Sequence, residues 1–245
     1  MKKIVLGSLV ATSILFADDA AVNSDDEFKL HAELGYIQTT GNTKTSSFST
    51  DLSVKKGWGK HRLKYDFNAQ FASENDKQTK NNMFNELNYY YSINKIFEFN
   101  YLVGYKQDKF SGFDYQAYTG PGGLYKVINS DIQKLNLSGN VLYEQDNIVN
   151  TATQTNYIKN YGAYVVKGYY KWDITKSFAF IQDASYRAEF KESSNFFVFS
   201  KSAVVSKITE MFSFGVSYKV DYKNQPPEGK EKTDTTFTAS IIIDY

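Results

Sequence analysis

Two histidines are the main candidates for catalysis in this chain, and His31 is the more informative of the two. His31 and Glu33 alternate with apolar residues, which places both on the polar face of a predicted strand. If the sheet closes on itself, the last strand becomes the neighbour of the first, and Thr238 and Ser240 would lie near His31. A hydroxyl, a histidine and a carboxylate are the components of a hydrolytic triad, so a lipid-modifying hydrolase is one alternative. No Gly-x-Ser-x-Gly motif accompanies them, which favours an ordinary polar network.

The other candidate motifs indicate no chemistry. His61 follows a predicted turn, where an interfacial role is expected. The sequence from Ser53 to Lys56 matches Ser-x-x-Lys, but it lies on a predicted strand instead of at a helix start. The acidic run at 25–27 could bind calcium weakly, but a solvated linker is the favoured interpretation. We therefore predict no catalytic, metal-binding or cofactor-binding residue and no enzymatic activity.

The N-terminal segment has the layout of an export signal. Lys2 and Lys3 precede an apolar run from Ile4 to Phe16, and cleavage is predicted after Ala17. This run is shorter than the roughly 20 residues that a membrane-spanning helix requires. We expect residues 1–17 to be a cleaved signal peptide, 18–27 an acidic periplasmic linker and 28–245 the folded domain.

Composition narrows the class of protein further. The chain has no cysteine, so disulfides and thiolate metal sites are excluded. Its net charge of +1 gives no indication of nucleic-acid binding. Aromatic residues make up 17% of the chain and there are three prolines, a mixture that favours strands. The mean hydropathy of −0.47 resembles that of a soluble protein, but a membrane strand exposes only alternate residues to lipid.

Alternation of apolar and polar residues continues along the whole domain. Leu63 to Phe71 and Phe97 to Tyr105 show it most clearly, whereas the sixth and tenth strands are weakly patterned. Twelve strands are predicted, at residues 28–39, 46–56, 61–72, 82–92, 97–108, 115–127, 133–144, 160–172, 177–188, 196–207, 212–222 and 234–245.

The joints between these strands alternate in length. Short turns are predicted near residues 59, 94, 130, 174 and 210. Longer polar loops are predicted at 73–80, 145–157 and 223–232. An even strand count, short periplasmic turns and longer extracellular loops are typical of outer-membrane barrels. The predicted fold is thus an all-β, closed antiparallel transmembrane barrel in a bacterial outer membrane. A soluble periplasmic barrel that binds an apolar ligand is the second alternative.

Three segments resemble a known family. They are GNTKTSSFSTDLSV at 41–54, GPGGLY at 120–125 and PPEGKEKTDTTFTASIIIDY at 226–245. Together they are similar to the salt-induced outer-membrane protein family, a domain family of unknown function. The resemblance implies an outer-membrane barrel with a link to salt or osmotic stress, and it implies no catalytic residues. Within GPGGLY, proline lacks a donor for the ladder, so a bulge or bend is expected there.

The polar faces of the strands define a predicted lumen. Their charges balance, which is consistent with a structural or pore-like role, either as a plugged barrel or as a narrow wet channel with little charge selectivity. The predicted lumen-lining residues are Lys29, Glu33, Asp51, Arg62, Lys64, Asp66, Glu86, Glu98, Lys106, Asp183, Arg187, Lys219 and Asp221.

The last strand carries a second predicted feature. Its apolar row resembles the C-terminal signal that barrel-assembly machinery reads, with the aromatic Tyr245 at the periplasmic interface. The expected partners are this machinery, outer-membrane lipid and lipopolysaccharide. The residues of the predicted assembly signal are Phe237, Ala239, Ile241, Ile243 and Tyr245.

Overall fold

The structure is a computed structural model of the chain, and it describes residues 28–39, 45–150, 155–226 and 231–244. The predicted signal peptide and linker at 1–27, and the predicted interfacial Tyr245, lie outside these residues. The described part contains no helix that is long and apolar enough to span a bilayer.

Its regular elements are twelve strands, as the alternation predicts. They are β1 (Phe28–Thr39), β2 (Thr45–Trp58), β3 (His61–Glu74), β4 (Lys77–Ser92), β5 (Phe97–Asp108), β6 (Phe113–Asn129), β7 (Gln133–Asn150), β8 (Thr155–Asp173), β9 (Phe178–Glu189), β10 (Phe196–Lys207), β11 (Phe212–Lys223) and β12 (Thr233–Asp244).

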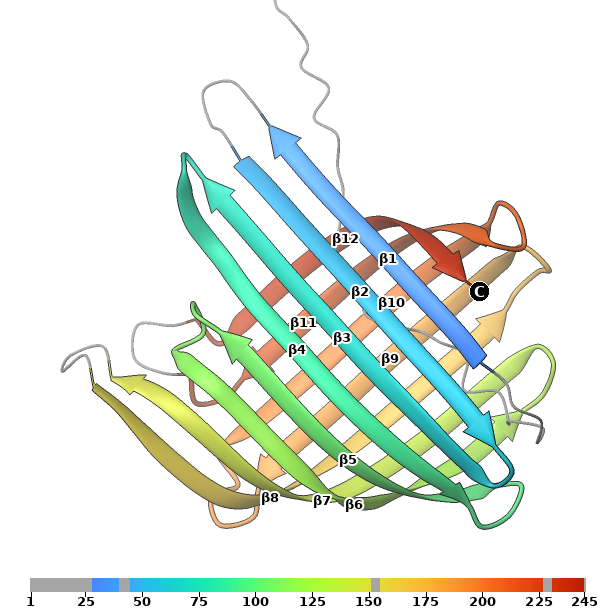
Figure 1. Cartoon of the computed structure of the whole chain (residues 1–245), viewed down its shortest axis with the longest axis horizontal. Coiled ribbons are helices and arrows are strands. Elements are labelled where there is room, and N and C mark those ends of the chain that lie inside the picture. The colour runs from blue at the N-terminus through green and yellow to red at the C-terminus, as the bar shows by residue number, and fades with distance from the viewer. Residues whose placement is uncertain (1–27, 40–44, 151–154, 227–230, 245) are drawn as a thin grey trace, which may run out of the picture.

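These strands form one closed antiparallel barrel in which each strand pairs with its neighbours in sequence (Figure 1). β1 closes the barrel against β12, over four described pairs from His31↔Asp244 to Leu34↔Ile241. By comparison, β11 and β12 share eleven described pairs. The predicted closed barrel is confirmed, and the seam between β1 and β12 is its shortest described ladder. We call the end that holds Phe28 and Asp244 the terminal end, and the opposite end the loop end.

The joint between β3 and β4 differs from the predicted loop at 73–80. The strands continue to Glu74 and from Lys77, so only Asn75 and Asp76 form the turn. Their φ angles are 48° and 63°, in the left-handed region that a two-residue hairpin requires. Asn and Asp tolerate this region better than most residues, so the central Asn-Asp pair determined the turn. The predicted eight-residue loop is therefore wrong.

β7 and β8 also extend well past their predicted bounds. β7 runs to Asn150 and β8 starts at Thr155, past the predicted limits of 144 and 160. Their ladder continues in register to Asn150↔Thr155. Polarity of the segment 145–157 indicated a loop, but polar side chains are compatible with a strand that leaves the apolar layer.

The expected bulge at GPGG does not occur. The β6–β7 register is the same on both sides of it, at Thr119↔Tyr143 and Gly122↔Asn140, and the shifts lie nearer the ends of β6. The glycines have another role, because a methyl group on Gly120 would lie 1.8 Å from the carbonyl oxygen of Val141. Gly120 thus permits a close approach of two backbones, and the weak pattern of β6 reflects packing instead of an irregular strand.

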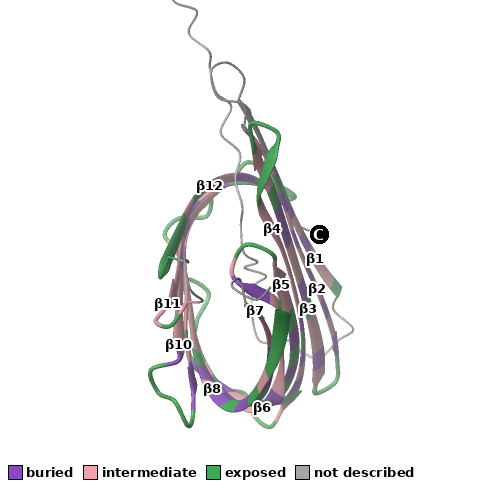
Figure 2. Ribbon diagram, turned by 90° about the vertical axis from the view of Figure 1, so that its left-hand side faces the viewer, coloured by how far each residue is buried: buried purple, intermediate pink, exposed green. Residues whose placement is uncertain are grey.

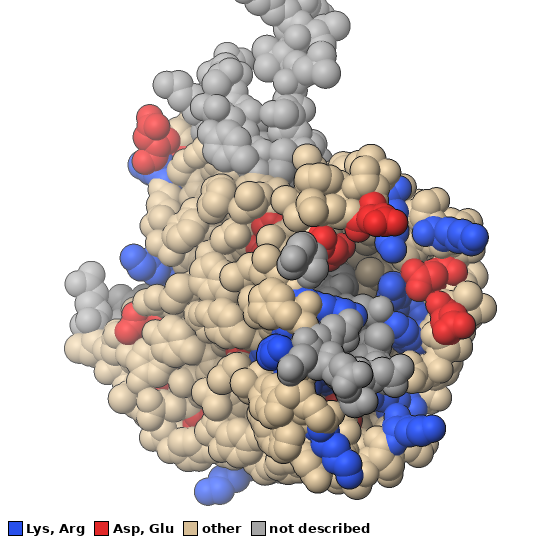
Figure 3. Space-filling view, turned by 45° about the vertical axis from the view of Figure 1, so that its right-hand side comes forward, with Lys and Arg blue, Asp and Glu red and all other residues tan. Residues whose placement is uncertain are grey.

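The two faces of the barrel differ in chemistry. Outward side chains such as Leu34 and Phe237 are apolar and 59% exposed. The interior contains buried polar residues, including Glu98 at 2% exposure, and Figure 2 shows that the barrel has an oval cross-section. In Figure 3 the wall is almost free of charge, whereas charged side chains gather around the terminal end. A belt of apolar side chains therefore surrounds a polar lumen.

Candidate functional site: a charged lumen

The lumen holds two cavities. The larger has a volume of about 520 Å³, and side chains from β2 to β12 line it. The smaller has a volume of about 90 Å³ and lies at the terminal end, between β8–β12 and β1. We call them the loop-end cavity and the terminal-end cavity. The larger of these two open volumes thus lies toward the loop end.

The structure distributes the predicted lumen residues among three places. Glu33 lines the terminal-end cavity. Arg62 and Glu98 are buried but line neither cavity, and Lys29 is half-buried near the start of β1. The remaining predicted residues line the loop-end cavity: Asp51, Lys64, Asp66, Glu86, Lys106, Asp183, Arg187, Lys219 and Asp221.

One ion pair crosses the interior. Lys167 Nζ on β8 lies 2.9 Å from Glu86 Oε1 on β4, although three strands separate β4 from β8. Asn88 and the hydroxyl of Tyr118 also donate hydrogen bonds to Glu86, at 2.8 and 2.7 Å. Tyr118 reaches Glu86 by lying over Gly104, where a Cβ would be 2.1 Å from its ring. This chord braces one wall of the barrel against another.

A second cluster fills the terminal-end half of the lumen on the side of β3–β6. Glu98 accepts hydrogen bonds from Arg62 at 2.6 Å and from Lys126 at 2.7 Å. The Arg62 guanidinium also lies over the ring of Tyr90, 3.9 Å from its centroid. All four side chains are buried. Because both cations serve one carboxylate and are immobilised by packing, this part of the lumen is closed by side chains.

A third cluster lies deep in the wall of β7–β9. The Tyr161 hydroxyl contacts both Glu144 and Asp146, at 2.9 and 2.8 Å. Arg187 lies 3.3 Å from Glu144, and its guanidinium is 4.3 Å from the ring centroid of Phe197. An Arg between a carboxylate and a ring is held in a fixed position, so its charge stays directed into the loop-end cavity.

The lumen also contains an apolar core that the alternation did not predict. Leu102, Leu142 and Val165 are almost fully buried and form one cluster with Tyr161, and Tyr118 packs against it. Leu102 lies on the same face of β5 as Glu98 and Asn100, which places it inside the barrel. The cluster fills part of the lobe between β5 and β8, and Leu142, Val165 and Tyr118 also form part of the wall of the loop-end cavity.

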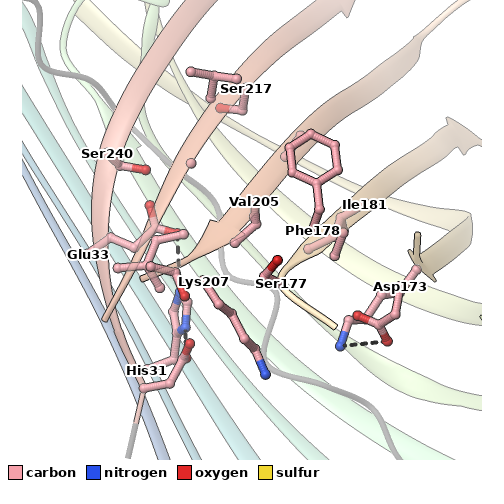
Figure 4. A pocket seen from close by; sticks show the side chains of 18 of the residues that line it. His31, Glu33, Asp173, Ser177, Phe178, Ile181, Val205, Lys207, Ser217 and Ser240 are labelled. Atoms are coloured by element: carbon pink, nitrogen blue, oxygen red, sulfur yellow. Dashed lines mark hydrogen bonds and ion pairs between the residues drawn. The ribbon is translucent and has the colours of Figure 1, made fainter. Parts of the chain in front are cut away.

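His31 lies at the seam, in the wall of the terminal-end cavity, and Figure 4 shows it beside Glu33 with Lys207 and Ser177 nearby. Its Nδ1 contacts Asp244 at 2.5 Å and its Nε2 contacts Glu33 at 3.2 Å. Ionised carboxylates accept hydrogen bonds only, so both ring nitrogens donate. No nitrogen of this ring remains to take a proton from a serine hydroxyl.

The register also corrects the predicted neighbourhood of His31. Its partner on β12 is Asp244, and Ser240 lies four residues farther along that strand. The hydrolase alternative therefore loses its base, and a seam-bridging ion pair replaces the proposed triad. The described residues contain no group of three or more His, Asp or Glu placed to hold a metal ion.

Sequence reasoning missed several lumen residues. Lys126 and Tyr118 lie on β6, and Lys201 lies on β10, the two strands with weak patterns. Lys167 lies on β8, whose apolar row is less regular than those of β3 and β5, but alternation along that row would still have assigned it inward. Asp244 could have been found in the same way, as the inward continuation of Ser240 and Ile242. Alternation of apolar and polar residues was therefore sufficient to find Lys167 and Asp244. It was too weak along β6 and β10 to find the other three residues.

Comparisons with known proteins agree with this geometry. The Escherichia coli (strain K12) protein described as uncharacterized protein YdiY is 24% identical over 248 residues, covering 96% of this chain and 93% of that protein. An outer-membrane channel from Pseudomonas putida F1 has a similar structure, with a TM-score of 0.57, 8% identity, and coverage of 94% of this chain and 100% of that one.

The NanC porin is also similar, with a TM-score of 0.53, 11% identity, and coverage of 89% of this chain and 98% of that one. These likenesses establish the fold. The family model described as protein of unknown function, DUF481, matches residues 32–245. The predicted resemblance to a domain family of unknown function is thus confirmed, and the chain belongs to the DUF481 family.

Proposed function

We propose that this protein is a pore-like barrel of the bacterial outer membrane that passes small polar solutes and catalyses no reaction. The observation that carries this proposal is the loop-end cavity, a space of about 520 Å³ inside a closed barrel, lined by charged as well as apolar side chains. A closed sheet leaves no unpaired edge for lipid, so such a cavity is reached along the barrel axis.

The outer surface supports a membrane location. A soluble barrel that bound an apolar ligand would direct its apolar rows inward, but here they face outward, as Leu34, Phe237 and Ile241 show with exposures near 60%. In the proposed orientation the terminal end faces the periplasm and contacts the barrel-assembly machinery during biogenesis. The apolar belt contacts outer-membrane lipid, and the loop end contacts lipopolysaccharide.

The lumen can support conduction without a tightly bound ligand. Its charged groups occur largely as neighbouring pairs, such as Lys64 with Asp66 at 3.1 Å and Lys219 with Asp221 at 3.0 Å. Paired charges offer polar contacts that replace part of an ion's hydration, but they do not trap it. Twelve strands fall between the filled eight-stranded barrels and the open sixteen-stranded porins, so a narrow passage is expected. The names porin and channel borne by the two similar structures are consistent with this role.

The test of the proposal is conductance of the refolded protein in a planar lipid bilayer. We expect discrete conductance steps that increase with salt concentration, and no steps from a mock preparation lacking the protein. Silence of correctly folded barrels over a wide range of salt and voltage would show that the lumen is plugged, and would overturn the pore.

Two further measurements address the alternatives. Substituting His31→Gln should leave membrane lipids unchanged in active cells, because the ring already contacts two carboxylates. Loss of a lipid-hydrolysis product in this variant would restore the enzyme alternative. Extraction without detergent should leave the protein with the membranes, whereas recovery in the aqueous fraction would favour the soluble barrel.

The role in salt or osmotic stress belongs to the same proposal and is supported by the family resemblance. Deleting the gene should reduce growth in high-osmolarity medium relative to standard medium, with rescue by the wild-type protein. Equal growth of the deletion strain and its parent in both media would remove this part of the proposal.

A further inference from the structure

We propose that Lys201 and three carboxylates opposite or beside it form the narrowest layer of the lumen, and that this layer makes the pore select cations over anions. The inference rests on the proposed function. We call Glu33, Asp51, Asp183 and Lys201 the charged layer. Its members occupy four different strands, and the lumen is open on both sides of it.

The charged layer lies at the boundary between the two cavities. Lys201 and Glu33 line the terminal-end cavity. Asp51 and Asp183 line the loop-end cavity, and none of the four lines both. We therefore place the layer on the path of a solute that passes from one cavity to the other.

The strand register places the layer on two opposing walls. Lys201 on β10 is the direct partner of Asp183 on β9, and Glu33 on β1 is the direct partner of Asp51 on β2. β10 and the β1–β2 pair lie on opposite sides of the oval in Figure 2. Lys201 nevertheless attracts Glu33 and Asp51 as well as Asp183, and it is repelled by Lys219. The register and strand order thus place Lys201 and Asp183 on one wall of the lumen, and Glu33 and Asp51 on the other.

Burial shows that little open space remains at this level. Lys201 and Asp51 are each 1% exposed, and Glu33 is 4% exposed. Charged side chains are almost never buried this completely unless they are paired, so these three side chains form a narrow polar contact, with the half-buried Asp183 beside them. Asn68 Nδ2 also donates to Asp51 Oδ1, which fixes one carboxylate in place.

The balance of charge differs here from the rest of the lumen. The charged layer holds three carboxylates and one ammonium group, that of Lys201. Lys219 is the partner of Lys201 on β11. Its Nζ forms an ion pair with Asp221 Oδ2 at 3.0 Å, so this pair adds no net charge. His31 offsets part of the charge of Glu33 through its contact at 3.2 Å. An excess of negative charge remains, and a ring of carboxylates is the usual device for selecting cations.

The experiment measures the reversal potential of the full-length barrel in a planar bilayer under a potassium chloride gradient. The wild-type protein should prefer potassium. Lys201→Met should shift the reversal potential further toward the potassium value and raise the conductance. The double variant Asp51→Asn with Asp183→Asn should shift it toward the chloride value. Lys95→Met is the control for loss of a positive charge, since this exposed lysine lies in the turn between β4 and β5.

The outcomes distinguish a failure of the selectivity proposal from a failure of the pore proposal. If the wild-type protein conducts and both layer variants keep its reversal potential, the charged layer is not the filter. If the wild-type protein is silent but Lys201→Met conducts, the layer closes the lumen, which supports the constriction.

A second measurement decides the case in which every variant is silent and the pore fails. The natural chain has no cysteine, so Lys201→Cys and Thr236→Cys each provide a unique thiol. Thr236 lines the loop-end cavity and lies on β12, two strands away from Lys201. In folded barrels a maleimide should label Thr236→Cys rapidly and Lys201→Cys with a large loss of rate. Equal rates would overturn the constriction.

Discussion

At the scale of single residues, the packing of the barrel interior depends on glycines, which leave room for neighbouring groups. Gly104 on β5 leaves the space into which the ring of Tyr118 fits, and this ring carries the hydroxyl that binds Glu86. Gly120 has a similar role toward the backbone of Val141. The polar network of the lumen therefore requires glycine at positions that contribute no polar atom.

Replacing Gly120 with Ala tests this requirement. The added methyl group would lie 1.8 Å from a backbone oxygen, so the β6–β7 ladder must shift. We expect a loss of about 1–3 kcal/mol in the free energy of unfolding, which is typical of overpacking. Gly139→Ala is the matched control, because its methyl group would have its nearest neighbour at 3.8 Å. Equal urea midpoints for the two variants would contradict the account.

At the scale of the elements, alternation determines which residues meet lipid. β5 shows it without interruption: Val103 faces outward and is 50% exposed, whereas Leu102 faces inward and is buried. The same rule extends to strands that continue past the apolar layer, such as β7 and β8. There the polar composition predicted a loop, although hydrogen bonding along the ladder is indifferent to side-chain polarity.

Introducing a charge on the outward face should be costly. Val103→Lys places an ammonium group near the middle of β5, facing lipid, and should cost about 2–4 kcal/mol of unfolding free energy in lipid vesicles. Thr236→Lys introduces the same group into the loop-end cavity and should cost much less. If the two variants lose equal stability, the outward face of β5 does not contact the bilayer core.

The outward row of β12 is the proposed assembly signal. Phe237 and Ile241 are strongly exposed in this row, with Ala239 and Ile243 between and after them. Substituting Tyr245→Ser should lower the yield of folded barrel in the outer membrane, and Tyr245→Phe should restore it because the aromatic ring is retained. Normal yield of the serine variant would argue against the signal.

At the scale of the whole molecule, cross-lumen contacts join strands that are not neighbours. The Glu86–Lys167 pair braces β4 against β8. A closed sheet can flatten or become more circular without breaking its ladders, so such a chord helps to define the oval shape. The apolar cluster around Leu102 and Leu142 lies within the lobe that this chord encloses.

A double-mutant cycle measures the coupling energy between Glu86 and Lys167. Lys167→Met alone leaves the buried Glu86 carboxylate without its cation and should destabilise the barrel. The same change in a Glu86→Gln background should cost less, with a coupling energy of about 0.5–3 kcal/mol in urea unfolding. Additive effects of the two substitutions would show that the contact contributes nothing to the shape.

The sequence by itself determined the twelve strands, their order and the face that each presents. These properties follow from local alternation and from turn residues, and in an antiparallel barrel each strand needs only its neighbours. The Asn75–Asp76 turn also follows from local sequence, because Asn and Asp favour a tight turn, although the polarity of the surrounding segment 73–80 suggested a longer loop.

Only the tertiary structure decided what the lumen does. Three features join strands that are far apart in sequence. They are the pairing of His31 with Asp244, the ion pair between Glu86 and Lys167, and the shared position of Lys201 and Glu33 in the wall of the terminal-end cavity. Alternation predicts that a residue points inward. It does not predict the level of that residue along the barrel axis or its distance from the opposite wall. Those depend on the stagger of all twelve strands around the closed barrel, which is a property of the whole ring.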